Sequence, residues 1–137
     1  MSTSAARGGS GGDTGGASPR AAVERFLGAV KAQDLQAIAV VWGTDKGPAR
    51  DRDDRENVEK AAFIMQCYLG HEQFRIVNEA TQADGKHVFR VALTKGSETR
   101  ETNFYTVQGP NEKWYVEQAD LEPVKDLRRL PPNQCAG

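Results

Sequence analysis

Two histidines and two cysteines are the side chains most suited to chemistry in this sequence. His71 and His87 stand without the Cys-x-x-Cys or His-x-x-x-His spacing that a zinc site needs, so we interpret them as strand-end or hairpin residues. Cys67 falls near the end of a predicted helix, whereas a reactive thiolate is favoured at a helix N-terminus or beside a histidine. No Gly-x-Ser-x-Gly elbow is present. We therefore predict neither a catalytic residue nor a metal site.

Two loops resemble ligand-binding motifs but lack essential parts of them. Residues 1–18 are rich in glycine and serine, yet no strand precedes them and no Gly-Lys-Ser/Thr occurs, so they are predicted to form a flexible tether. Residues 43–55 contain Asp51 and Asp53 at calcium-loop spacing, but Arg55 and Glu56 stand where a third ligand and a glycine are required. This stretch is interpreted as a solvated loop, and no cofactor is predicted.

Charge and hydropathy exclude two further classes of protein. Lys plus Arg total 18 against 19 Asp plus Glu, for a net charge of −1 over 137 residues. This balance argues against a nucleic-acid binder, which would need a basic field. No apolar run is long enough for a transmembrane segment. The length suits one domain, for which we set the boundaries at residues 19–124, with a C-terminal tail over 125–137.

Helical periodicity covers the first half of that domain. Ser18 and Pro19 form a cap and first turn, after which apolar residues recur at i, i+3, i+4 and i+7. Asp34 caps a second stripe that ends at Trp42. Asp53, with Glu56 three residues later, predicts the start of a third helix that ends at Gly70.

Beyond Gly70 the period changes from helical to alternating. Four strands are predicted within residues 71–80, 86–94, 97–108 and 112–121, separated by short turns such as Asp84-Gly85. Short connections make neighbouring strands antiparallel. The fold class is therefore α+β, with three N-terminal helices packed on a curved four-stranded meander. One face is expected to be apolar through Phe74, Ile76, Phe89, Val91, Leu93, Trp114 and Val116.

The order of elements, with the opening PRAAVERFLGAVKAQDLQAIAVVW and the closing GPNEKWYVEQADLEPV, resembles the nuclear transport factor 2-like superfamily over residues 19–124. The chain is also similar to Gly/Ser-tethered bacterial lipoproteins of that superfamily whose function is not assigned. The resemblance implies a cone-like domain and specifies no chemistry.

The resemblance implies two arrangements of catalytic residues, known from enzymes of this superfamily, that can be compared with this sequence. A ketosteroid-isomerase-like site would place its tyrosine at Phe26, which cannot donate a hydrogen bond, and its second donor near Asn103. The carboxylate base has no matching position, because residues 43–55 are too short for the hairpin that carries it. An epoxide-hydrolase-like relay has its nearest match at Arg100 and Glu101, without a partner aspartate. The resemblance therefore favours a protein that is not an enzyme.

The cone implied by the resemblance is where a small-molecule pocket would lie. Trp42, Tyr68, Asn103 and Tyr105 are the candidate ligand-binding residues at its mouth, joined by Trp114. The other interpretation is that the aromatic residues are simply core. We expect a non-catalytic domain that binds a small apolar ligand or a protein, with a small isomerase or dehydratase using the cone as the alternative.

A weak homodimer through the sheet is also predicted. Val77, Val88 and Tyr115 are expected on the face away from the helices, where apolar residues favour pairing of two copies. Arg75, Arg90 and Glu117 share that face and would have to be paired across it.

The cysteine count bears on the compartment. Cys67 and Cys135 could form a disulfide, which persists in an oxidising environment. Together with the tether, this predicts an extracytoplasmic protein, lipid-anchored in its native form. The alternative is a cytoplasmic protein in which Cys67 is a small buried residue and Cys135 is unpaired.

Overall fold

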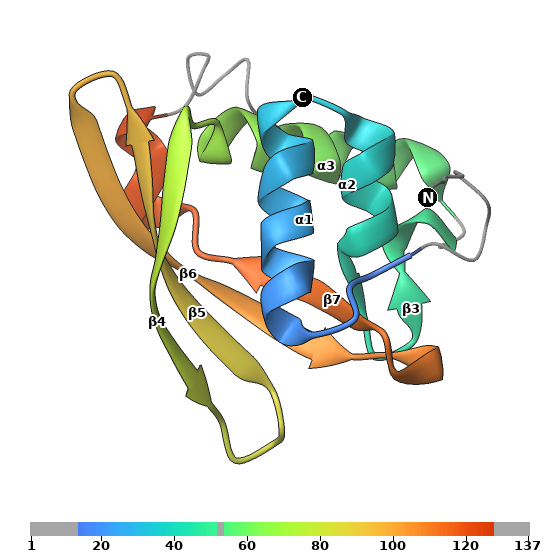
Figure 1. The fold of residues 1–137 in the computed structure, drawn as a ribbon. Helices are drawn as coiled ribbons and strands as arrows, with labels where there is room; N and C mark the ends of the chain where they lie inside the picture. Colours follow the sequence, from blue (N-terminus) through green and yellow to red (C-terminus); the bar gives the residue numbers. More distant parts are fainter. Residues whose placement is uncertain (1–13, 52–53, 128–137) are drawn as a thin grey trace, which may run out of the picture.

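Three α-helices lie against one face of a four-stranded antiparallel sheet in the computed structural model, which describes residues 14–51 and 54–127 (Figure 1). The helices are α1 (Pro19–Lys31), α2 (Leu35–Val41) and α3 (Arg55–Leu69). The fold is therefore α+β, as the change of period after Gly70 predicts.

The helix starts follow from side-chain caps. Ser18 accepts a hydrogen bond from the Ala21 N–H at 3.1 Å, and Asp34 accepts one from the Ala37 N–H at 3.1 Å. Both caps were expected from the sequence. The third helix starts one residue later than predicted, because Asp54 rather than Asp53 caps it.

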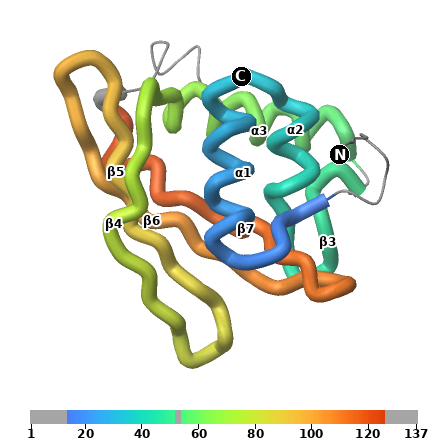
Figure 2. The backbone as a smooth tube through the Cα atoms, viewed as in Figure 1, coloured from blue at the N-terminus to red at the C-terminus, as the bar shows by residue number. Residues whose placement is uncertain are grey.

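The sheet is a meander of β4 (Gln73–Thr81), β5 (His87–Lys95), β6 (Glu98–Gln108) and β7 (Trp114–Ala119), in the order β4-β5-β6-β7. The tube in Figure 2 shows the β4–β5 hairpin extending past the N-terminal end of α1. A bulge between Ile76 and Asn78 interrupts the pairing of β4 with β5, and a second irregularity lies between Tyr105 and Thr106.

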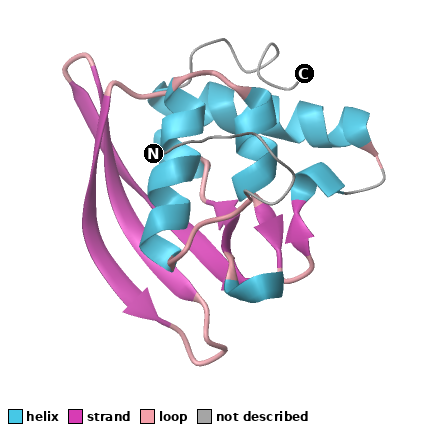
Figure 3. Cartoon of the chain, turned by 45° about the vertical axis from the view of Figure 1, so that its right-hand side comes forward, coloured by secondary structure: helices cyan, strands magenta, loops and turns pink. Residues whose placement is uncertain are grey.

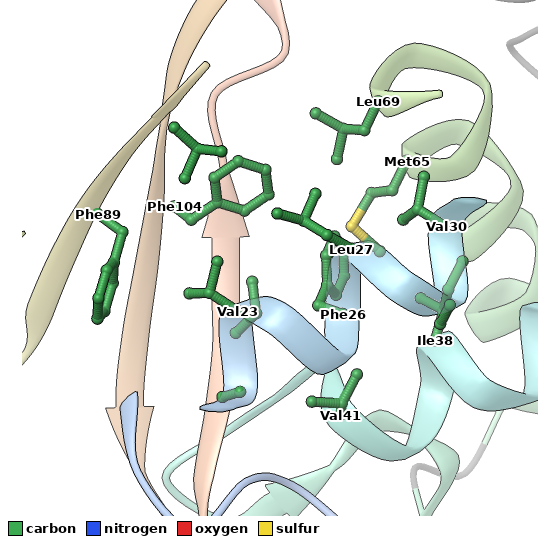
Figure 4. Close-up of a cluster of buried hydrophobic side chains, with 14 of the residues drawn as sticks. Val23, Phe26, Leu27, Val30, Ile38, Val41, Met65, Leu69, Phe89 and Phe104 are labelled. Atoms are coloured by element: carbon green, nitrogen blue, oxygen red, sulfur yellow. The ribbon is translucent and has the colours of Figure 1, made fainter. Parts of the chain in front are cut away.

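The core lies between the helices and the inner face of the sheet. Helix α1 contacts β5, β6 and β7, so the two layers in Figure 3 meet along this helix. Phe26 and Phe104 pack edge to face with their ring centroids 6.0 Å apart, and both are fully buried. Figure 4 shows how the side chains of α1 and the strands fill the interior. Phe74 was expected on the apolar face of the sheet and lies on that inner face, opposite Leu93, but it is 37% exposed because β4 is the edge strand.

The segment interpreted as a solvated loop contains regular structure. Strands β2 (Gly43–Thr44) and β3 (Gly47–Pro48) form a two-stranded hairpin, followed by the short 3-10 helix η1 (Ala49–Asp51). Ala49 is fully buried and forms a small cluster with Ala39 and Val58. Strands of two residues have no detectable alternation, so the hairpin could not be predicted from periodicity.

Residues 14–16, which belong to the predicted tether, pack against β7 and α2. Gly16 and Trp114 exchange two backbone hydrogen bonds of 2.8 Å, and the Gly15 N–H donates to the Val40 carbonyl at 2.8 Å. Thr14 is buried and lies 2.9 Å from the Tyr115 hydroxyl. The remainder of the predicted tether, residues 1–13, lies outside the described residues.

Two short 3-10 helices complete the described chain. Helix η2 (Pro110–Glu112) joins β6 to β7, and η3 (Glu122–Leu127) follows the last strand. Val124, at the predicted domain boundary, is fully buried in the core. No described helix is long and apolar enough to cross a membrane. Most of the predicted C-terminal tail lies outside the described residues.

Candidate functional site

Asn103 and Tyr105 point away from the core on the outer face of the sheet. Phe104 stands between them on β6 and is fully buried against Phe26. Successive side chains of a strand point to opposite faces, so the flanking residues must face outwards. Both side chains are half-buried.

Asp120, which the sequence did not single out, joins these two residues. Its carboxylate Oδ2 accepts hydrogen bonds from the Tyr105 hydroxyl at 3.0 Å and from the Asn103 amide nitrogen at 3.4 Å. Its backbone N–H donates to the Asn103 carbonyl at 3.0 Å, and its carbonyl accepts from the Thr102 hydroxyl. Asp120 is therefore fixed through both its backbone and its side chain.

Arg90 and Glu101 extend the cluster across β5. The Arg90 Nε donates to Glu101 Oε1 at 2.8 Å, and its Nη1 donates to Asn103 Oδ1 at 3.4 Å. We call Arg90, Glu101, Asn103, Tyr105 and Asp120 the polar array. Its ion pair is exposed, so the pair adds little stability and mainly fixes orientation.

Tyr105 acts as a neutral hydrogen-bond donor in this array. Burial raises its pKa above the ordinary value, and the hydrogen bond to Asp120 raises it further, so the phenol keeps its proton at neutral pH. The array thus presents a fixed phenol, amide, guanidinium and carboxylate on one surface. These groups can recognise backbone and polar side chains of a partner by directional hydrogen bonds.

The structure does not bring all four predicted ligand-binding residues together. Trp42 ends α2 and forms a parallel bridge with Val116, and its side chain packs against the core. Tyr68 lies near the end of α3 and is also packed against the core. Asn103 and Tyr105 are on the other side of the sheet, so these residues do not line one pocket.

The residues matched to enzyme constellations are engaged in other contacts. Phe26, at the tyrosine position, is enclosed in the core. Arg100 pairs with Glu98 at 2.9 Å, whereas Glu101 pairs with Arg90, so the nearest match to the relay is split between two ion pairs. No aspartate or glutamate among the described residues is buried.

The two histidines have different surroundings. The His71 Nδ1 lies 2.9 Å from the Leu69 carbonyl, and its buried Nε2 has no hydrogen-bond partner. His87 lies on β5 with its Nδ1 3.1 Å from Glu79 Oε2, and its ring stands edge to face with Trp114. The β4–β5 register brings Glu79 near His87, which the residue types alone do not reveal. Among the described residues, no group of three His, Cys, Asp or Glu is placed to hold a metal ion.

Three hollows on the described part of the surface are lined by residues other than the predicted ligand-binding residues. One, of about 230 Å³, lies between α2 and α3 beside Arg50 and Arg55. Another, of about 180 Å³, lies where α1 and α3 end, beside Lys31 and His71. The third, of about 360 Å³, lies over the start of β4 and is lined by Gln73, Phe74, Arg75, Ala92, Thr94 and Thr99.

Two further predictions concern Tyr115 and the cysteines. Tyr115 was expected to be exposed on a dimer face, but it is buried beneath residues 14–16 and bonded to Thr14. Cys67 is buried in α3 and is disulfide-bonded. Cys135 lies outside the described residues, so the pairing of these two cysteines stays a prediction.

The comparisons with known proteins add no assignment. No family model matches the chain, and no curated protein matches its sequence.

Proposed function

We propose that this chain is a non-catalytic binding domain that recognises another protein through the outer face of its sheet. The observation that carries the proposal is the absence of a buried carboxylate among the described residues. A ketosteroid-isomerase-like site of the expected type uses a carboxylate as its base, with its pKa tuned by its surroundings. Instead, apolar side chains such as Val23, Leu27 and Phe89 occupy the interior (Figure 4).

The outer face supports the choice of a protein as the partner. The three α-helices lie on the opposite face of the sheet (Figure 1), and the polar array displays Tyr105 and Arg90 on the outer face in fixed orientations. Tyrosine and arginine are enriched in protein interfaces, because each combines a large contact area with directional hydrogen bonds. A small apolar ligand would find few surrounding surfaces on such a face.

The proposed superfamily and cellular location follow from the family resemblance. We propose a cone-like member of the nuclear transport factor 2-like superfamily, and the succession of three helices and a meander supports it. The glycine- and serine-rich residues 1–13 support a tether, and hence an extracytoplasmic, lipid-anchored protein. A cytoplasmic location is the alternative.

A small isomerase or dehydratase remains the second candidate, and one pair of residues favours it. Glu79 holds the Nδ1 of His87, which would leave Nε2 to act as a base next to the Trp114 ring. Replacing His87 with glutamine would abolish such an activity without unfolding the chain. The binding proposal expects that variant to retain its partner.

Site-specific photo-crosslinking in cells that naturally produce the protein tests the proposal. A benzophenone amino acid would replace Gln118, which is exposed and pairs with Tyr105 across β6 and β7. The matched control carries the same group at Lys60, an exposed residue of α3. We expect a discrete protein adduct from position 118 only, and its loss on Asp120→Ala substitution.

Small-molecule binding is tested in parallel by thermal shift with a panel of steroids and fatty acids. The proposal expects no increase in Tm with any of them. A saturable increase in Tm without an adduct at position 118 would show that the chain binds an apolar ligand rather than a protein.

A further inference from the structure

The two edges of the sheet differ in whether other segments of the chain pair with them. At the β7 edge, Gly16 pairs with Trp114, and Trp42 forms a bridge with Val116. At the other edge, β4 pairs with β5 and has no second neighbouring strand among the described residues. Nine residues of β4 therefore present backbone groups to solvent along one side.

The exposed apolar side chains of the molecule lie on this open edge. Phe74 is 37% exposed and Val77 is 41% exposed, and these are the large hydrophobic residues found exposed in the described part of the chain. Phe74 packs edge to face on the buried His71, with centroids 5.8 Å apart, so its ring is held in place. A fixed aromatic ring beside an open strand offers an anchor for an apolar side chain.

The charge near the start of β4 is positive. Arg75 is exposed and has no polar partner among residues 14–51 and 54–127. Lys31 and Lys95 line the nearby hollow with Glu72. Glu72 already accepts a hydrogen bond from the Gly96 N–H at 3.0 Å. Arg75 therefore offers a positive charge at the start of β4 that an acidic side chain of a partner would neutralise.

The two kinds of side chain lie on opposite faces of the strand. Arg75 pairs with Ala92 on the outer face, whereas Phe74 pairs with the fully buried Leu93 and so points to the inner face. The hollow of about 360 Å³ opens beside Arg75. A strand added at this edge would alternate in the same way, with acidic residues facing outwards and apolar residues facing inwards.

The β-bulge argues against a second copy of this chain as the added strand. A two-fold interface pairs β4 antiparallel with itself, and residues opposite each other must lie on the same face. Pairing centred on Val77 would set Arg75 opposite Glu79. Arg75 points outwards, but Glu79 pairs with the buried Phe89 and points inwards, because the bulge shifts the alternation. Symmetric pairing with opposite residues on the same face is therefore limited to residues on one side of the bulge.

We propose that the β4 edge binds an extended segment of another protein, with alternating apolar and acidic residues, as an added strand. The segment's backbone pairs with β4, its apolar side chains pack on Phe74, and its acidic side chains meet Arg75. This inference rests on the proposed function as a binding domain and assigns it a second surface, apart from the polar array.

Two synthetic peptides test the inference with the full chain. Both are capped octapeptides, one alternating valine with glutamate and the other valine with lysine. Backbone amide resonances are followed during each titration. We expect the glutamate peptide to shift residues 73–77 and to bind at least about tenfold more tightly, a difference of about 1.4 kcal/mol.

Charge reversal provides the matched variants. Arg75→Glu should reverse the preference in favour of the lysine peptide, whereas Lys60→Glu, an equivalent change on exposed α3, should leave it unchanged. Phe74→Thr should weaken the binding of both peptides. Unchanged amide spectra away from the substitution show that each variant is folded.

Three results would overturn the inference. These are equal binding of the two peptides by the unaltered chain, shifts confined to the polar array, and shifts of β4 that depend on protein concentration alone. The last would assign the edge to a second copy. If the peptides do not bind as expected but position 118 gives an adduct, the inference about β4 fails and the proposed function stands. If the glutamate peptide binds but position 118 gives no adduct, the polar array is not a binding surface and the β4 edge still is.

Discussion

His71 combines a buried ring with one unused nitrogen. It is 8% exposed, and its Nε2 has no partner, while Nδ1 can donate to the Leu69 carbonyl. Burial lowers the pKa below 6.5, the Leu69 hydrogen bond opposes this change in part, and the charge of Lys31 adds to the lowering. The ring is therefore kept neutral, with a desolvated acceptor at the junction of α3 and β4.

This environment predicts acid sensitivity. Because the folded pKa lies below the unfolded value, the unfolded chain binds more protons between the two, and stability falls as pH drops below 6.5. Urea unfolding at about pH 7.5 and about pH 5 should show a smaller difference in His71→Phe than in the unaltered chain. The His87→Gln variant separates the two imidazoles. Identical pH slopes for the unaltered chain and His71→Phe would contradict the prediction.

At the scale of elements, residues 14–16 lie beside β7, held by the isolated bridge between Gly16 and Trp114 and by the contact of Thr14 with Tyr115. Gly15 has a positive φ of 66°, and a side chain there would meet the Trp114 carbonyl at 2.7 Å. The Arg25 side chain donates to the Gly15 carbonyl at 2.7 Å. Glycine is therefore required at this position by both the backbone conformation and the close approach.

Two truncations should separate the contribution of residues 14–16 from that of the residues before them. Removing residues 1–13 should change the unfolding free energy by no more than about 0.5 kcal/mol, as expected of polar tether composition. Removing residues 1–17 should cost about 1–3 kcal/mol, since the Thr14 contact and the pairing with Trp114 are lost. Chemical denaturation measures both. Equal stability of the two truncated chains would show that the pairing contributes nothing.

Regular elements could be predicted from the sequence, and irregular ones could not. The stripe from Val23 to Val30 and the Ser18 and Asp34 caps gave the helices, because periodicity and capping are local properties. The bridge at Gly16 depends on a contact with Trp114, far along the chain, and the Gly-rich composition around it resembles a linker.

The candidate site, too, could be predicted only in part from the sequence. Asn103 and Tyr105 were identified as polar and aromatic groups on one strand face, but their partner Asp120 is set by the β6–β7 register and its irregularity after Tyr105. Trp42 and Tyr68 were grouped with them by residue type, and only the three-dimensional arrangement separates them.

For the molecule as a whole, we predict that a disulfide from Cys67 to Cys135 ties the C-terminal segment to the domain. Cys67 lies on α3 facing the core, and η3 returns the chain to the same helix. A bridge from Cys67 to Cys135 would close a loop of about 70 residues and stabilise the fold by about 4 kcal/mol in the chain-entropy model.

Mass spectrometry of unreduced protein tests that bridge. Native, air-equilibrated chain unfolded in denaturant with an alkylating reagent should take up no alkyl group, and two after reduction. The Cys135→Ser variant should take up one without reduction and should unfold more easily. Two adducts on the unreduced chain would contradict the bridge and weaken the case for an oxidising compartment.

The pairing of Gly16 with Trp114 also sets the path of mechanical tension through the molecule. A pull on the chain ahead of Thr14 is transmitted first to the contact of Thr14 with Tyr115 and the hydrogen bond of Gly15 to Val40, then to the two hydrogen bonds between Gly16 and Trp114, and past Ser18 into α1. The β4 edge lies at the far side of the sheet, three strands from β7. Tension on that end would therefore peel residues 14–16 from β7 before it distorted β4, so a segment bound at the β4 edge would remain held.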